Sequence, residues 1–343
     1  MKKLLALLIA LTMVFALAAG TASADDADDF HIDLTYSNVF NPAEWNYKAA
    51  ELFAEAVTER TEGHITVTYH GLNELDCYGD SLVHAYNGDN WIGLEEPSLF
   101  AEYVGDCAVL AGPMLFTNDD EYNYIMGSDV VADILDRLAE ENIHVLDTHY
   151  SFGYRSVVTN KDIYTPADLN GVKLRSTTAP LFIKTIECMG ATPVPMSFTE
   201  CLSSISSGVV DGFEGSTSTL AGAGAPYELV KKVALTNHFI ATRWLFMAQD
   251  VYESIPEKWR DILDECALEF GMWEQTSCAD DEAVQIEKMK TEDGVTWNEV
   301  DVEAFTEACA PVYDWIVEEY DANPDLHQQL VDLLTAFRAE KAA

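Results

Sequence analysis

The chain has 343 residues, of which 48% are hydrophobic and 23% charged, so it is long enough for one large or two medium-sized domains. An aromatic content of 11% is too high for a disordered chain. The formal net charge of −40 excludes nucleic acid and disfavours anionic lipid as partners, because both would be repelled over most of the surface.

The first 24 residues have the pattern of a secretory signal peptide. Lys2 and Lys3 precede an apolar run over residues 4–19, and Ala22 and Ala24 provide the small residues that signal peptidase reads. The run is short for a membrane span, and no cysteine lies near the cleavage point for lipid attachment. The pattern predicts cleavage after Ala24 and an exported, soluble mature protein that is not a lipoprotein.

Strand and helix patterns alternate along the first half of the mature chain. Residues 31–36 are typical of a strand, a helix with an apolar stripe begins after Pro42, and a strand follows at 65–69. This order predicts a βαβ unit and a parallel sheet. The elements predicted next are a helix at 81–86, a strand at 91–94, a helix at 119–139 and a strand at 143–150.

The second half continues the alternation and then becomes helical. Two strand-like segments, 144–148 and 154–159, follow each other without a helix between them, so we expect the chain to cross between domains on a strand near residue 150. The elements predicted beyond are a helical turn at 166–171, strands at 172–175, 209–212 and 244–248, and helices at 179–189, 197–208 (with capping-box spacing), 256–290, 302–320 and 325–338.

Two α/β lobes joined by more than one chain crossing predict a clamshell that closes on a ligand. We expect residues 25–152 and about 239–280 to form lobe I. Residues 153–238 and about 281–343 are then expected to form lobe II.

The motifs of the common enzyme classes are missing. The sequence has no nucleophile elbow, HExxH motif, phosphate loop or dinucleotide-binding glycine motif. The seven cysteines form no CxxC pair and no ligand set with histidine, which argues against zinc and favours small buried apolar residues. These absences predict no catalytic residues, no metal and no cofactor, and favour a binding protein over a secreted α/β hydrolase or lyase.

Cations are scarce, so each arginine is informative. Arg155 and Arg175 lie at or near predicted strand ends among apolar or small residues. An arginine fork binds a carboxylate through two parallel hydrogen bonds, which makes both candidate ligand contacts, with an ordinary salt bridge as the alternative. Arg243 follows a predicted crossover, and the sequence leaves open whether it binds ligand or forms an ion pair.

Other side chains are candidates for the cleft between the lobes. Glu95 or Glu96 could accept a hydrogen bond from a ligand hydroxyl or ammonium group. Aromatic side chains supply apolar contact area at low entropic cost, but each could equally belong to the core. The aromatic candidates are Trp45, Trp91, Phe152, Phe198, Phe213 and Trp244.

Four ordered motifs give the chain a likeness to a known family. They are GVKLR at 171–175, MGATPVPMSFTE at 189–200, GVVDGFE at 208–214 and LTNH at 235–238. With a further match at 153–155, they resemble the solute-binding proteins of TRAP transporters, of the DctP type, over nearly the whole mature chain.

The resemblance implies a periplasmic receptor that captures a small organic acid and delivers it to a membrane permease driven by an ion gradient. It also implies a long helix that spans both lobes of the clamshell. In the family pattern, Arg175 pairs with the ligand carboxylate, Arg155 is a second and less uniform contact, and Phe198 packs against the ligand. A receptor that serves a sensor or an ABC-type importer is the alternative, and a monomer is the default.

The chain departs from the family pattern after Asp211. The family often has Gln and Asn where this chain has Phe213 and Gly215, and the Asn hydrogen-bonds the ligand. The loss of this amide predicts a changed choice of ligand rather than lost binding, because Arg175 remains. The sequence leaves open whether the pocket prefers aromatic or sugar acids.

Overall fold

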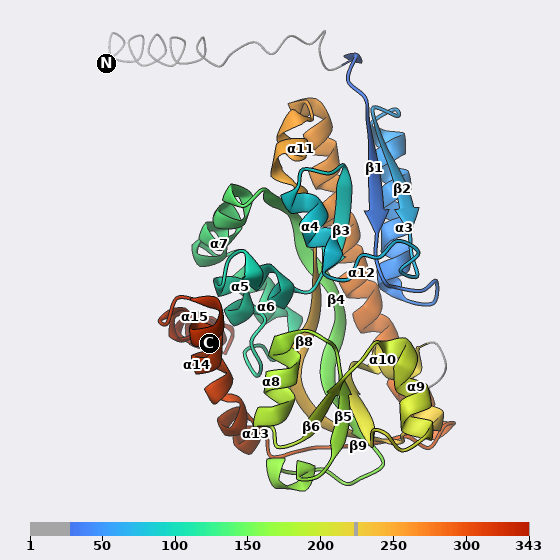
Figure 1. Cartoon of the computed structure of the whole chain (residues 1–343), viewed down its shortest axis with the longest axis vertical. Helices are drawn as coiled ribbons and strands as arrows, with labels where there is room; N and C mark the ends of the chain where they lie inside the picture. Colours follow the sequence, from blue (N-terminus) through green and yellow to red (C-terminus); the bar gives the residue numbers. More distant parts are fainter. Residues whose placement is uncertain (1–27, 223–225, 343) are drawn as a thin grey trace.

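The computed structural model describes residues 28–222 and 226–342; the predicted signal peptide lies outside these residues. The described residues contain one mixed sheet with the strand order β2-β1-β3-β8-β4-β7-β5-β6, and β9 lies beside β8 (Figure 1). The strands are β1 (Ile32–Ser37), β2 (Ile65–His70), β3 (Trp91–Glu95), β4 (Ile143–Thr159), β5 (Lys173–Ser176), β6 (Thr192–Pro195), β7 (Gly212–Gly215), β8 (Lys232–Ala248) and β9 (Thr296–Asn298).

Helices cover both faces of this sheet. The α-helices are α3 (Trp45–Arg60), α4 (Asp80–Tyr86), α5 (Asp106–Leu110), α6 (Asp119–Met126), α7 (Asp129–Glu140), α8 (Pro180–Cys188), α9 (Phe198–Ser206), α10 (Thr217–Ala221), α11 (Gln249–Ser254), α12 (Glu257–Thr291), α13 (Val302–Cys309), α14 (Pro311–Tyr320) and α15 (Leu326–Lys341). Short 3-10 helices lie at Pro97–Glu102, Pro166–Leu169 and Pro226–Glu228. No helix among the described residues is long and apolar enough to cross a bilayer.

Two long antiparallel strands connect the halves of the molecule. β4 and β8 have 17 residues each. At one end β3 pairs with β8, and β1 and β2 extend the sheet to form lobe I. At the other end β7 pairs with β4, and β5 and β6 extend it to form lobe II. The β4–β8 register shifts repeatedly between Val145 and Val157, so the regular ladder is interrupted between the two lobes.

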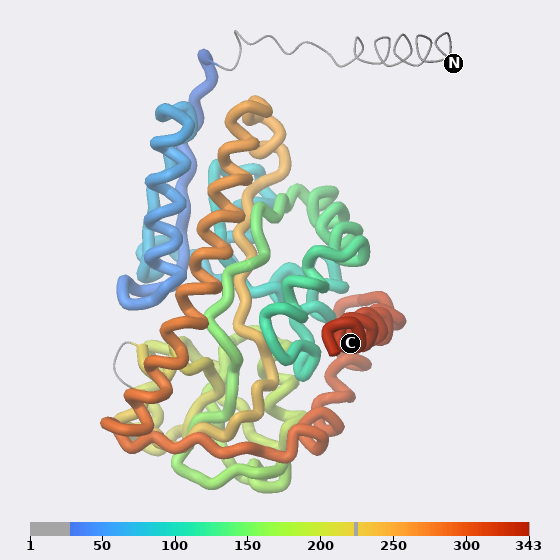
Figure 2. The backbone as a smooth tube through the Cα atoms, turned by 180° about the vertical axis from the view of Figure 1, so that it is seen from behind, coloured from blue at the N-terminus to red at the C-terminus, as the bar shows by residue number. Residues whose placement is uncertain are grey.

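The 35-residue helix α12 runs along β4 and contacts both lobes (Figure 2). Its first half buries Trp259 and Leu263 against lobe I in a cluster that includes Phe53 of α3. Its last turns bury Met289 with Leu220 of α10 in lobe II. The predicted two-lobed clamshell with a spanning helix is therefore confirmed.

The C-terminal helices also contact both halves. α14 packs against α5 and α8, and α15 packs against α5 and α6. Their apolar residues Ile316, Leu330 and Leu334 share one buried cluster with Phe182 of α8. The predicted boundaries of the lobes stay predictions, and the segment after α13 touches both lobes.

Several predicted elements have different limits in the structure. The predicted helix at 119–139 is two helices, because Ser128 caps α7 by accepting a hydrogen bond from the Val131 N–H. The predicted helix at 302–320 divides at Pro311, which has no N–H to continue α13 and starts α14. The strand predicted at 209–212 begins only at Gly212, and the one at 244–248 is the end of the much longer β8.

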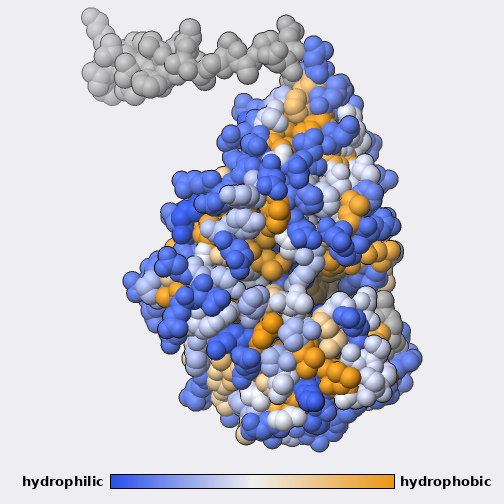
Figure 3. Space-filling model, in the orientation of Figure 1, coloured by the Kyte–Doolittle hydropathy of each residue, from blue (hydrophilic) through white to orange (hydrophobic). Residues whose placement is uncertain are grey.

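Other local predictions are confirmed. Ser197 and Glu200 form the capping box of α9, in which the Ser197 N–H donates to Glu200 Oε2 at 3.1 Å. All seven cysteines are free thiols, six of them buried, as expected of small apolar residues. Most of the surface in Figure 3 is hydrophilic, in keeping with the excess of acidic residues.

Gly105 lies where the C-terminal helices meet lobe I. A Cβ atom at this position would lie 2.1 Å from the carbonyl oxygen of Tyr320, and a backbone atom cannot rotate away. We expect Gly105→Ala to lower the free energy of unfolding by about 1–3 kcal/mol in urea denaturation. Gly127→Ala is the control, since its Cβ would lie 3.5 Å from the nearest such atom, the Asn123 carbonyl oxygen; equal losses in both variants would contradict the prediction.

Candidate functional site

Three buried arginines lie where the two lobes meet. Arg155 comes from β4, Arg175 from β5 and Arg243 from β8, and their exposed fractions are 5%, 6% and 7%. A buried guanidinium needs an anion or several hydrogen-bond acceptors to offset its lost hydration. The partners of the three arginines therefore decide which of them can take a ligand.

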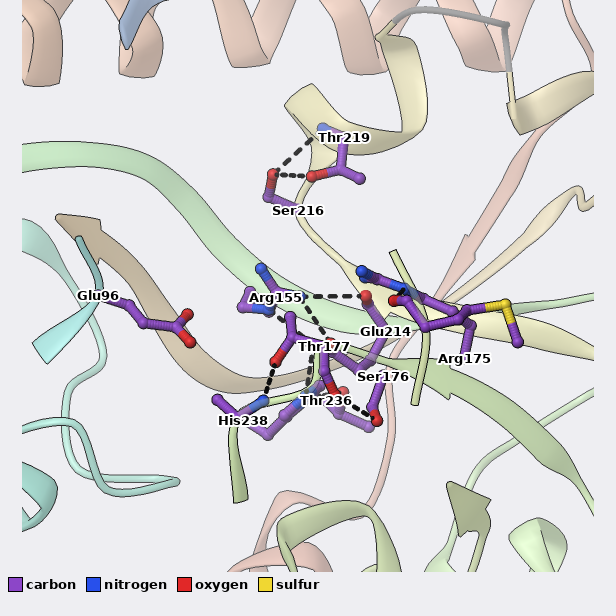
Figure 4. A network of polar contacts seen from close by, with 12 residues as sticks. Glu96, Arg155, Arg175, Ser176, Thr177, Glu214, Ser216, Thr219, Thr236 and His238 are labelled. Carbon is purple, nitrogen blue, oxygen red and sulfur yellow. Dashed lines mark hydrogen bonds and ion pairs between the residues drawn. The ribbon is translucent and has the colours of Figure 1, made fainter. Parts of the chain in front are cut away.

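Arg155 already has a partner within the protein. Its Nε and Nη2 atoms donate to the two carboxylate oxygens of Glu214 on β7, both at 2.6 Å. Burial would raise the pKa of Glu214, but the charge and hydrogen bonds of Arg155, with His238 nearby, hold it well below its usual value. Arg155 and Glu214 form a closed bidentate ion pair (Figure 4).

His238 extends this pair. Its Nδ1 lies 2.8 Å from Thr236 Oγ1, and its Nε2 lies 3.6 Å from Glu214 Oε2. The side chain is 0% exposed, and burial lowers its pKa, so the ring is neutral at pH 7. The neutral ring adds no positive charge beside Arg155.

Arg175 lacks a counter-charge. Its Nε donates to the Met196 carbonyl oxygen at 3.0 Å, and its guanidinium carbon lies 5.4 Å from the centre of the Phe198 ring. No carboxylate among the described residues lies within ion-pair distance of it, and burial lowers its pKa. The site thus holds a buried cation for which lobe II provides no anion.

Lobe I presents a polar group to the same junction. Tyr78 donates a hydrogen bond to Glu96 Oε1 at 2.6 Å, and Glu96 Oε2 lies 3.5 Å from Nη1 of Arg243. Glu96 Oε2 and Ser98 Oγ are buried without a hydrogen-bond partner. Glu96, Ser98, Arg155 and Arg243 line one pocket, and in Figure 4 the Glu96 carboxylate points toward Arg155.

The structure brings together five of the predicted site residues. Phe198 lies under Arg175, and Phe213, fully buried, packs edge-on against Phe198 with ring centres 5.7 Å apart. The five are Glu96, Arg155, Arg175, Phe198 and Phe213.

Three other predicted residues have different surroundings. Gly215 adjoins Phe213, since a Cβ atom on Gly215 would lie 2.9 Å from Phe213 Cε2, and it lines a cavity of about 160 Å³ on the α12 side of the sheet. Trp244 is fully buried in lobe I, where its Nε1–H donates to Tyr122 Oη at 3.0 Å. Trp45 packs against Trp273 and donates to Asp281 of α12.

Sequence reasoning missed several members of the group. Glu214 lies inside a recognised motif, but its partner Arg155 is 59 positions away, and no spacing rule joins them. Tyr78 and Ser98 lie in segments whose pattern signals no binding function. Arg243, left open by the sequence, pairs with Glu96 at the junction.

Glu95, beside Glu96 in sequence, is held differently. Its Oε1 accepts a hydrogen bond from the Gly79 N–H at 2.9 Å, and burial raises its pKa from 4.5 to about 8. Because the folded protein holds this proton more tightly than the unfolded chain, the stabilisation is complete below pH 4.5 and is lost as the pH rises through 8.

We expect the free energy of unfolding to fall by up to about 1.4 kcal/mol per pH unit between pH 4.5 and 8 because of Glu95. Urea denaturation of Glu95→Gln should show a flatter profile there, and an unchanged slope would contradict this.

Comparison with known proteins gives a consistent family. The family model described as bacterial extracellular solute-binding protein, family 7 (DctP) matches residues 36–320. A solute-binding protein of Chromohalobacter salexigens is 32% identical over 87% of this chain and 88% of its own length.

Solved structures of TRAP periplasmic solute-binding proteins share the fold. One from Fusobacterium nucleatum with bound sn-glycerol-3-phosphate is 30% identical, with a TM-score of 0.86 over 91% of this chain and 99% of its own. One from Desulfovibrio salexigens, in complex with diglycerolphosphate, is 31% identical, with a TM-score of 0.87 over 91% and 99%. One from Chromohalobacter salexigens with bound D-glucuronate is 28% identical, with a TM-score of 0.80 over 88% and 99%. The chain belongs to family 7 of the bacterial extracellular solute-binding proteins, the DctP family of TRAP transporter receptors.

Proposed function

We propose that this receptor captures a small organic anion between its lobes, with the acidic group of the ligand bound to Arg175. The observation that carries the proposal is the buried Arg175 guanidinium without a carboxylate partner. A ligand carboxylate would supply the missing charge through two parallel hydrogen bonds. The closed lobes would then deliver the ligand to the membrane permease.

The charges at the site support a singly charged ligand group. Arg155 is balanced by Glu214, and Arg243 is balanced by Glu96. The positive charge of Arg175 is the one that remains unbalanced, and one ligand carboxylate would balance it. We assign Arg155 to positioning the site, because its fork already binds Glu214 through two hydrogen bonds.

A phosphate ester is the second candidate for the acidic group. The two structural relatives with TM-scores of 0.86 and 0.87 hold glycerol phosphates, whereas the relative with bound D-glucuronate has a TM-score of 0.80. Arginine recognises phosphate with the same planar fork that it offers to carboxylate. Both classes therefore belong in the test.

The test is a thermal-shift and calorimetry panel on the mature chain, after any co-purified ligand has been removed by reversible unfolding. The panel contains hexonates, hexuronates, glycerol phosphates and aromatic carboxylates. Ligand at 100 times its Kd should add about 2.7 kcal/mol of stability. Recovery of one equivalent of unchanged ligand would separate a receptor from an enzyme, and a panel without any binding would overturn the proposal.

We also propose export through a signal peptide cleaved after Ala24, and function as a monomer in the periplasm. The basic start, apolar run and small residues before the predicted cleavage point support export. Intact mass of the exported protein measures the cleavage point, and light scattering measures the oligomeric state. A mass that retains the first 24 residues would contradict the cleavage.

A further inference from the structure

We infer that Glu274, in the middle of α12, is a proton-controlled latch between the lobes. As a neutral carboxyl group it fastens α12 to α3 and to β4, and its ionisation opens that junction. The inference does not depend on the proposed function, because no ligand takes part in it. The atoms that carry it are the two carboxyl oxygens of Glu274, which accept hydrogen bonds from Asn46 Nδ2 at 2.9 Å and from the Ser151 N–H at 2.8 Å.

Glu274 joins three elements at the place where the lobes meet. Asn46 belongs to α3 of lobe I. Ser151 stands in β4 immediately before one of the register shifts of the β4–β8 ladder, and α12 contacts both lobes. The Glu274 side chain therefore ties the irregular part of the two long strands to the helix that spans the molecule.

Glu274 is buried without a cation. Its exposed fraction is 0%, and no lysine, arginine or histidine of the described residues forms an ion pair with it. Burial raises the pKa of Glu274 well above 4.5, and the carboxyl groups of Asp119 and Asp147 raise it further. An ionised carboxylate here would lose its hydration without gaining a counter-charge. A bound proton removes that cost.

The groups around Glu274 supply no positive charge to it. Asp147 lies against Gly271, one turn earlier on α12, where an added Cβ atom would overlap the Asp147 carboxylate. The Nδ1 atom of His149 lies 2.7 Å from Asp147 Oδ1, so a charge on this histidine is directed to Asp147. The other titratable groups that face Glu274 are Asp119 of α6, Tyr36 of β1, Tyr150 of β4 and Cys278 of α12.

Asn46 can hold the neutral carboxyl as well as the ionised one. Asn46 is 1% exposed, and its Oδ1 atom is buried without a hydrogen-bond partner, so a half-turn of the amide breaks no bond at that end. The turn places an acceptor where Nδ2 stands now, and a protonated Oε1 of Glu274 would donate to it. The bond between the two side chains is then kept with its direction reversed, while Oε2 still accepts from the Ser151 N–H.

The test compares the wild type with Glu274→Gln in urea over a series of pH values. Glutamine imitates the neutral acid, since its carbonyl can accept from the Ser151 N–H and its NH₂ can donate to Asn46. A raised pKa stabilises the folded chain fully below pH 4.5, and this stabilisation is lost as the pH rises through the folded-state pKa. Over that range the unfolding equilibrium constant of the wild type should rise about tenfold more per pH unit than that of the variant.

The difference between the two chains isolates Glu274, because both retain Glu95 and His149. Glu287→Gln is the matched control, since it removes an exposed carboxylate from the same helix, and its profile should follow the wild type. Equal slopes in the wild type and Glu274→Gln would overturn the proposal. A Glu274→Gln chain that is less stable than the wild type at every pH would also overturn it, because the fold would then need the ionised form.

Hydrogen exchange of the Ser151 amide tests the latch itself. An ionised Glu274 regains water only when the junction opens, so exchange should become faster in the wild type than in Glu274→Gln as the pH rises, by about tenfold per pH unit. The two chains are compared at the same pH, which cancels the intrinsic dependence of exchange on hydroxide. Equal exchange at all pH values would overturn the latch.

Infrared spectroscopy gives a readout that does not require Glu274→Gln to fold. With ¹³C-labelled glutamate in the Glu95→Gln chain, the C=O band of a neutral glutamic acid should remain at neutral pH. Glu95, whose pKa is raised to about 8, cannot supply that band because it has been replaced. Absence of the band would overturn the proposal and leave the proposed function untouched.

Discussion

Arg175→Ala is expected to weaken ligand binding by about 10²-fold or more, and to leave the ligand-free protein at least as stable as the wild type. The loss of affinity follows because the ligand's acidic group would be buried without a partner. The gain or neutrality in stability follows because burial of an uncompensated guanidinium, which lowers its pKa, opposes folding of the free protein. Calorimetry measures the first effect and urea denaturation the second.

Arg175→Lys is the informative control. It keeps the charge but removes the planar fork, so we expect affinity between those of the wild type and Arg175→Ala. If Arg175→Ala kept its affinity, the acidic group would bind elsewhere. If the same variant lost stability as well as affinity, Arg175 would be part of the fold rather than a site reserved for ligand.

Glu214→Ala should cost about 3–5 kcal/mol of unfolding free energy, because it leaves Arg155 buried without a counter-charge. Arg155 donates its two shortest hydrogen bonds, both of 2.6 Å, to this carboxylate. Removal of both charges in Arg155→Met/Glu214→Ala should recover much of the loss, since no unpaired charge remains. Urea denaturation of the single and double variants measures the coupling, and additive losses would contradict it.

The Arg155–Glu214 pair and His238 determine how the free energy of unfolding changes with pH. The pKa of Glu214 is lowered in the folded protein, so its stabilisation is present above its unfolded pKa of 4.5 and is lost as the pH falls below it. The pKa of His238 is also lowered, so its contribution is present above 6.5 and declines as the pH falls below that value. Both groups make the wild type less stable in acid, and Glu214→Gln should lose the component below pH 4.5.

Sequence reasoning reaches those candidate site residues that lie in contiguous motifs. Arg175 belongs to a short motif with a recognisable strand, so its position needs no knowledge of distant contacts. The Arg155–Glu214 pair depends on the pairing of β4 with β7, where Val157 lies opposite Glu214. Register is a tertiary property, so residue spacing along the chain does not give it.

The same limit applies to the aromatic and glycine predictions. Trp244 lies opposite Glu95 in the pairing of β3 with β8, but its side chain enters the lobe I core. Gly215 directly follows Glu214 on β7 and faces the other side of the sheet, with Phe213, because successive residues of a strand face opposite sides of the sheet. Predicting which face of the sheet a side chain occupies requires the first and last residues of the strand, and the predicted limits of β7 were wrong by three residues.

The interrupted β4–β8 ladder has a mechanical consequence. Between Val145 and Val157 the register shifts several times, and Gly153 has a φ angle of +87°, which glycine adopts without strain. A pair of strands whose ladder is already irregular has few backbone hydrogen bonds to break when it bends. Rotation of one lobe against the other therefore demands little enthalpy from the backbone, and most of the free energy gained from the bound anion is retained as affinity.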